Sequence, residues 1–117
     1  MGDNSGLVSE RQRVIDRARA ASPADAAYLI ADFNCRRAIS HEEGLSLKEI
    51  SPELGALEIE TLERQANALF RDEGYFGEKH WAGQPRENIF AEMRIRHPGF
   101  NQAIYGRALM RGILATR

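Results

Sequence analysis

The chain has 117 residues, of which 43% are hydrophobic and 28% charged, and its net charge is −1. This balance is typical of a folded globular protein and excludes an intrinsically disordered chain. The longest apolar run, AAYLIA at residues 26–31, is far shorter than the roughly 20 residues that a membrane-spanning helix needs. The opening MGDNSG lacks the basic flank and apolar stretch of a secretory signal, and the single cysteine, Cys35, excludes an internal disulfide. We therefore expect a flexible N-terminus over residues 1–6 and one cytoplasmic domain over residues 7–117.

Two helices are predicted in the first forty residues. Residues 7–21 carry apolar side chains at helical spacing, and Ser22-Pro23 ends this segment. Ser22 is expected to cap the second helix, with Pro23 in its first position and Asp25 in its first turn. The second helix is expected to continue to about Ser40. The side chains that we expect it to bury are Ala26, Leu29, Ile30, Phe33 and Cys35.

A third, longer helix is predicted to start at Ser51-Pro52-Glu53, which repeats the order of cap, proline and acid. Its apolar residues recur at steps of three and four, and we expect it to end near Gly74. Its buried face is expected to contain Ile59, Leu62, Ala66 and Leu69. The aromatic-rich residues 75–83 that follow are expected to be irregular.

Two more helices are predicted after Pro85. The first is expected to end at His97-Pro98-Gly99, because proline disfavours helical geometry in the residue before it. Asn101 is expected to cap the last helix. The buried stripe of that helix is expected to comprise Ile104, Tyr105, Ala108, Leu109, Gly112 and Ile113.

Gly112 is unusual because glycine inside a helix costs about 0.5–1 kcal/mol relative to alanine. Close approach of a neighbouring helix would compensate for this cost, whereas a frayed C-terminus would make glycine harmless. We favour the close approach. No long segment alternates between apolar and polar residues as a strand would. The fold expected from the sequence is therefore all-α, a compact bundle of about five helices.

Residues 45–76, LSLKEISPELGALEIETLERQANALFRDEGYF, resemble the core of winged helix-turn-helix regulators. The resemblance rests on Ser51 four residues before Gly55, and on Gly74-Tyr75-Phe76 where the chain of that family enters its wing. It implies a DNA-reading helix between these two points.

The same segment departs from the family pattern in three ways. Thr61 stands where the family has a branched apolar residue. Pro52 would fall inside the first helix of the motif, where proline costs roughly 3 kcal/mol. The helix that would enter the DNA groove is acidic, and such a face repels phosphate; its acidic residues are Glu58, Glu60, Glu63, Asp72 and Glu73.

Chemistry of other kinds has little support in the sequence. His41, His80 and His97 lack the spacing of a helical metal site, so no metal is expected. No motif places a histidine or oxyanion donors beside Cys35, which is more typical of a core residue. No glycine-rich phosphate loop follows a strand, so no cofactor is expected. The chain is therefore predicted to have no catalytic residues and not to be an enzyme.

Two sets of residues are candidate contact sites. The segment YFGEKHW combines three aromatic rings with a histidine, and such rings either cover the end of a core or bind a partner. The candidate partner contacts are Tyr75, Phe76, His80 and Trp81. Basic residues near the C-terminus either form a solvated face or touch nucleic acid. The candidate nucleic-acid contacts are Arg94, Arg96, Arg107 and Arg111.

Charge is unevenly distributed along the chain. Residues 41–78 carry a net charge of −7, and residues 79–117 carry +5. Opposite charges favour antiparallel packing within one chain or across a two-fold axis. We therefore expect a small cytoplasmic, non-catalytic helical protein that binds a protein partner or a second copy of itself. The alternative is a nucleic-acid-associated regulator that uses residues 45–76 or the C-terminal arginines.

Overall fold

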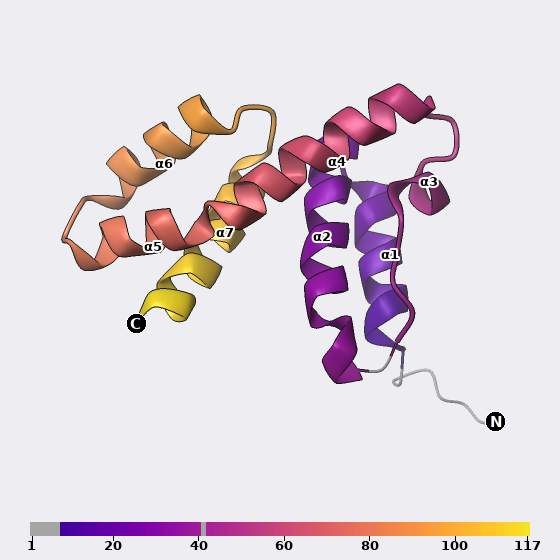
Figure 1. The fold of residues 1–117 in the computed structure, drawn as a ribbon, viewed down its shortest axis with the longest axis horizontal. Helices are drawn as coiled ribbons and strands as arrows, with labels where there is room; N and C mark the ends of the chain where they lie inside the picture. The colour runs from indigo at the N-terminus through magenta and orange to yellow at the C-terminus, as the bar shows by residue number, and fades with distance from the viewer. Residues whose placement is uncertain (1–7, 41) are drawn as a thin grey trace. The chain divides into compact units, whose positions relative to one another are not determined.

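The structure is a computed structural model, and it describes residues 8–40 and 42–117 (Figure 1). These residues form helices and no strand, so the all-α prediction is confirmed. The helices are α1 (Glu10–Ala20), α2 (Pro23–Ser40), α3 (Leu47–Ile50), α4 (Ala56–Arg71), α5 (Glu73–Trp81), α6 (Arg86–Arg96) and α7 (Gln102–Thr116). Within the described ranges, each helix is too short or too polar to cross a membrane.

The chain divides into two compact units, Met1–Glu63 and Arg64–Arg117, and α4 contributes residues to both. The first unit has twelve acidic and seven basic side chains, a net charge of −5. The second unit has five acidic and nine basic side chains, a net charge of +4. The predicted flexible residues 1–6 lie outside the described part of the chain, and the single domain over residues 7–117 stays a prediction.

In the first unit, α1 and α2 pack side by side (Figure 1). Ser9 caps α1 by accepting a hydrogen bond from the amide of Gln12. Ser22 caps α2 as predicted, since its hydroxyl oxygen accepts from the amide of Asp25 at 3.3 Å. The apolar residues of α2 that were expected inside, Ala26, Leu29, Ile30 and Phe33, are buried.

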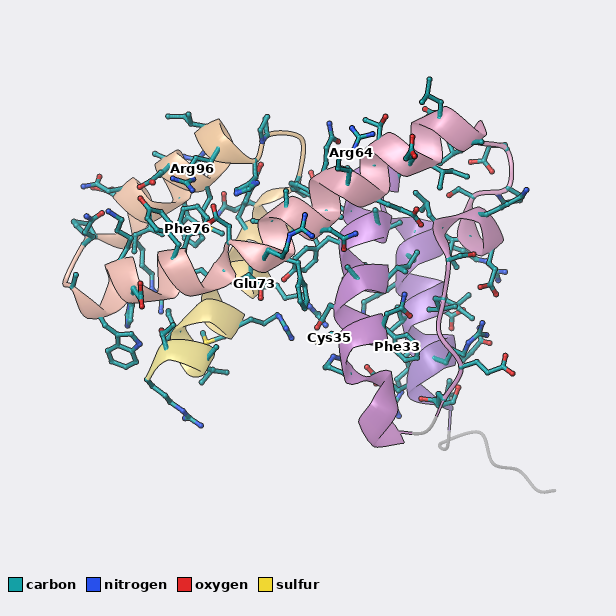
Figure 2. All side chains as sticks on the ribbon, viewed as in Figure 1. Phe33, Cys35, Arg64, Glu73, Phe76 and Arg96 are labelled. Atoms are coloured by element: carbon teal, nitrogen blue, oxygen red, sulfur yellow. The ribbon has the colours of Figure 1, made fainter. Side chains whose placement is uncertain are left out.

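Cys35 corrects this picture of α2, because its side chain is exposed and not buried (Figure 2). Phe33 is fully buried, and Cys35 follows it by two residues. Residues two apart on a helix do not share a face. The expected buried stripe therefore ends at Phe33.

Residues 43–45, which precede α3, are hydrogen-bonded to α1 and α2. The side-chain amide of Asn34 donates to the carbonyl of Leu45 at 2.9 Å and accepts from its N–H at 2.8 Å. Arg11 on α1 donates to the carbonyls of Glu43 and Gly44, each at 3.2 Å. Together these bonds replace the backbone pairing that an irregular segment lacks.

The prediction that Ser51 caps a helix beginning at Pro52 is wrong. Ser51 ends α3, because its N–H donates to the carbonyl of Leu47, and α4 begins only at Ala56. The capping serine is Ser46, which forms a capping box with Glu49. Each of these two side chains accepts from the backbone amide of the other residue, so two otherwise unpaired donors are satisfied.

Residues 75–83 also differ from expectation, since most of them form α5 instead of an irregular segment. Figure 1 shows α5 crossing α7. A Cβ atom added to Gly77 would overlap the carbonyl group of Gly112, so the two helices touch through their backbones. This contact confirms that Gly112 allows close approach of a neighbouring helix. It also explains how a glycine-containing segment is helical, because packing compensates for weak local propensity.

The rest of the second unit follows the sequence prediction closely. Helix α6 starts after Pro85 and ends before His97, and it buries Ile89 and Met93. Helix α7 starts after Asn101, although the Asn101 side chain makes no capping hydrogen bond to it. Its buried residues are the predicted ones: Ile104, Tyr105, Ala108, Leu109, Gly112 and Ile113.

Candidate functional site

Trp81, the last residue of α5, is held in place yet largely exposed. Its indole Nε1 donates a hydrogen bond to the carbonyl oxygen of Ile113 on α7 at 3.2 Å. The hydroxyl of Thr116 also lies 3.5 Å from this carbonyl oxygen, which can accept two hydrogen bonds. Trp81 nevertheless remains 54% exposed. The ring is therefore oriented by the fold while part of its surface faces solvent.

Two exposed apolar side chains of α7 lie at the same end of the second unit. Met110 is 46% exposed and Leu114 is 51% exposed, and they lie one turn apart on one face of the helix. Leu114 directly follows Ile113, whose carbonyl binds Trp81. We call Trp81, Met110 and Leu114 the Trp81 surface.

The Trp81 surface lies in a basic part of the chain. Residues 102–117 contain three arginines, Arg107, Arg111 and Arg117, and no acidic residue. The last of these, Arg117, is exposed beyond the end of α7. The exposed apolar groups thus belong to a unit whose net charge is +4.

The other three predicted partner contacts have different positions. Phe76 is fully buried, so it belongs to the core. Tyr75 is partly buried, and its hydroxyl donates to the carboxylate of Glu92 on α6 at 2.6 Å. His80 packs edge-on against the Trp81 ring, with 5.0 Å between the ring centroids. Of the predicted set, only Trp81 and its neighbour His80 thus lie together at this end of α5.

The four arginines proposed as nucleic-acid contacts already have partners within the chain. Arg96 pairs with Asp72 at 3.0 Å and lies over the ring of Tyr75, and Figure 2 shows it reaching from α6 toward α5. Arg111 pairs with Glu73 at 3.0 Å, and Arg94 donates to the side chain of Gln102. Arg107 is half-buried and also interacts with other residues.

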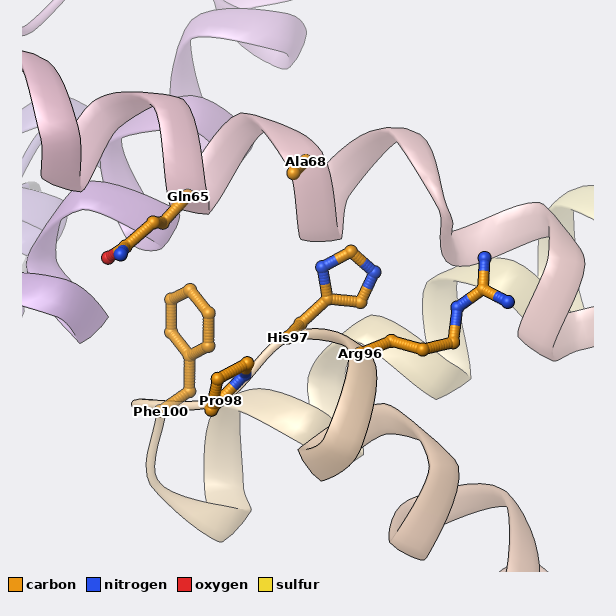
Figure 3. A pocket seen from close by; sticks show the side chains of 6 residues that line it. All are labelled: Gln65, Ala68, Arg96, His97, Pro98 and Phe100. Carbon is orange, nitrogen blue, oxygen red and sulfur yellow. The ribbon is translucent and has the colours of Figure 1, made fainter.

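A small pocket lies at the end of α6 (Figure 3). His97 Nε2 is 2.8 Å from an Asp72 carboxylate oxygen, which can only accept when ionised, so Nε2 carries the proton. The pocket volume is about 260 Å³, below the usual size of ligand sites. The residues that line it are Gln65, Ala68, Arg96, His97, Pro98 and Phe100.

The charged side chains around His97 pair with one another. Asp72 is shared between His97 and Arg96, and Glu92 is shared between Arg96 and Tyr75. These contacts join α5 to the end of α6. We therefore interpret the Asp72–His97 pair as a structural link between helices.

The segment that resembles a winged helix-turn-helix motif is built differently from that family. Helix α3 has only four residues, and Gly74-Tyr75-Phe76 lies inside α5 where the family pattern has a wing. These residues therefore do not form the wing that the resemblance implies. In the described ranges, no three His, Cys, Asp or Glu side chains gather as a metal site would require; His41 lies outside them.

No family model, no curated protein and no solved structure matches the chain. We therefore infer its function from the residues and distances described above.

Proposed function

We propose that the chain is a non-catalytic protein-binding module and that the Trp81 surface is its contact site. The hydrogen bond from Trp81 to Ile113 carries the proposal, because it orients an indole ring that remains more than half exposed. A side chain that is already ordered loses little conformational entropy when it binds. Tryptophan is also among the residues most enriched in interface hot spots.

Met110 and Leu114 support the same proposal as exposed apolar side chains of α7, three residues before and one residue after the Ile113 that Trp81 contacts. Exposed apolar groups that gather in one region are a mark of interaction sites on soluble proteins. Burying them against a partner contributes about 25 cal/mol for each Å² of apolar surface removed from water. The net charge of +4 on the second unit favours a partner surface that is apolar at its centre and acidic around it.

The proposal is tested by isolating the tagged chain from the cells that make it. We compare the parent with Leu114→Glu, which places a negative charge in the Trp81 surface. The matched control is Ile95→Glu on α6, because Ile95 is 79% exposed and its substitution should affect folding as little. We expect the parent and the control to retain the same partner, and Leu114→Glu to lose it. Retention of the partner by Leu114→Glu, or a parent that is monomeric and retains no other protein, would contradict the proposal.

Nucleic-acid binding is the alternative function, and retention on a heparin column tests it. Arg96 and Arg111 are engaged in ion pairs, so a phosphate would have to compete with Asp72 and Glu73 for them. We therefore expect weak retention on heparin. Strong retention that falls steeply with salt would instead support a nucleic-acid partner, because neutralised phosphates release counterions.

A further inference from the structure

We propose that the partner of the Trp81 surface is a second copy of the chain, which contributes the start of α4. This inference rests on the proposed function and names its partner. The start of α4 carries a second exposed apolar side chain, Leu57, which is 75% exposed. Glu53 and Glu58 beside it are exposed as well. An apolar centre with acidic neighbours is the surface that a basic, apolar site should bind.

The two segments that carry these surfaces have opposite charges in the sequence. Residues 49–63 contain five acidic residues and no basic one, whereas residues 102–117 contain three arginines and no acidic one. The units that carry them have net charges of −5 and +4. Contact between such surfaces gains electrostatic attraction, and it also opposes pairing of either surface with its own copy.

The contact joins the first unit of one copy to the second unit of the other. In a two-fold dimer each copy contributes both surfaces, so the contact between Leu57 and the Trp81 surface forms twice. Attraction between exposed charges is screened beyond about 8 Å at physiological ionic strength. We therefore expect dimerisation to weaken with added salt, but to persist in part because the centre of each contact is apolar.

The test uses two substitutions, each of which introduces into one surface the charge that its partner surface already carries. Leu57→Lys places a positive charge opposite the basic face of α7, and Leu114→Glu places a negative charge opposite the acidic start of α4. Light scattering should give the parent twice its chain mass of 13.2 kDa. We expect each variant alone to dimerise about tenfold more weakly or worse, since each loses a central apolar contact and gains repulsion. Ile95→Glu should dimerise as the parent does.

An equimolar mixture of the two variants provides the decisive comparison. One contact of the mixed dimer has both native surfaces. The other contact joins the lysine introduced by Leu57→Lys to the glutamate introduced by Leu114→Glu, so the mixture should recover the dimer. Circular dichroism of each variant confirms that its helices are intact. A parent that stays monomeric at all concentrations, variants that dimerise normally, or a mixture that stays monomeric would overturn the proposal.

These outcomes separate this inference from the proposed function. One outcome is a parent that is monomeric and binds a different protein, which the Leu114→Glu variant does not retain. In that case the proposal of a second copy is wrong, and the Trp81 surface remains the contact site. If Leu114→Glu changes neither the mass measured by light scattering nor the protein that is retained, the dimer contact and the proposed function of the Trp81 surface are both overturned. Trp81, the only tryptophan, also reports the contact directly, because its emission should shift to the blue as the parent is concentrated.

Discussion

Gly77 and Gly112 bring the backbones of α5 and α7 into direct contact. A Cβ atom on Gly112 would overlap the carbonyl oxygen of Glu73, and it would lie 3.2 Å from the amide nitrogen of Gly77. Backbone atoms cannot move aside as the end of a flexible side chain can. The crossing of these helices therefore depends on the absence of side chains at both positions, and it also places Trp81 beside the end of α7.

Gly112→Ala is expected to destabilise the protein although alanine is the better helix former. The added methyl group must push α5 away from α7, and overpacking of this kind typically costs about 1–3 kcal/mol. Urea unfolding measures the loss as a lower midpoint. A variant as stable as the parent would mean that the two helices do not touch here.

Gly106→Ala is the matched control, because it changes a glycine of the same helix. A Cβ atom at Gly106 meets no atom within 4 Å. Helix propensity alone should then act, and it favours alanine by about 1 kcal/mol. Opposite signs at the two glycines would separate a packing contact from a general effect of glycine on α7.

The capping serines provide a second prediction. Ser46→Ala is expected to cost about 1 kcal/mol, within the usual 0.5–2 kcal/mol for a cap, since it removes the bond to the amide of Glu49. Ser22→Ala should have a similar cost at the start of α2. Ser51→Ala should be nearly neutral, because the backbone of Ser51, and not its side chain, ends α3. Thermal melts of the three variants test this order.

Glu49 is expected to make stability depend on pH in the acid range. Its hydrogen bond from Arg11 and its bond from the Ser46 amide lower the pKa of the carboxyl below the ordinary value of 4.5. A depressed pKa in the folded state stabilises the fold above the unfolded value, and this contribution is lost as pH falls through the folded value. Glu49→Gln should therefore flatten part of the acid limb below pH 4.5. A carboxyl midpoint at or above the ordinary value in an NMR titration would contradict this.

Local patterns in the sequence were sufficient where a helix carries its own signals. Ser22-Pro23 marks the start of α2, and the stripe of α7 is apparent from its spacing. Helix α5 carries no such signal, because Gly74 and Gly77 weaken it locally and its packing partner lies 35 residues further along the chain. Helix α3 is too short for periodicity, and only the Ser46–Glu49 spacing could have identified it.

The Trp81 surface could be predicted only in part, because helix α5 carries no local signal in the sequence. Trp81 belonged to the predicted set, but Phe76 could not be assigned to the core while α5 was expected to be irregular. Met110 and Leu114 were missed. They each follow a member of the buried stripe and lie four residues apart, so their exposure was implied once α7 was recognised as a helix.

Site-specific photocrosslinking in the cells that make the protein tests the Trp81 surface most directly. A photoreactive residue replaces Met110 in one variant and, as a control, the more exposed Ile95 in another. We expect a discrete crosslinked species from position 110 and none from position 95, and a species of twice the chain mass if the partner is a second copy. Equal crosslinking at both positions, or none at position 110, would contradict the assignment of this surface as the contact site.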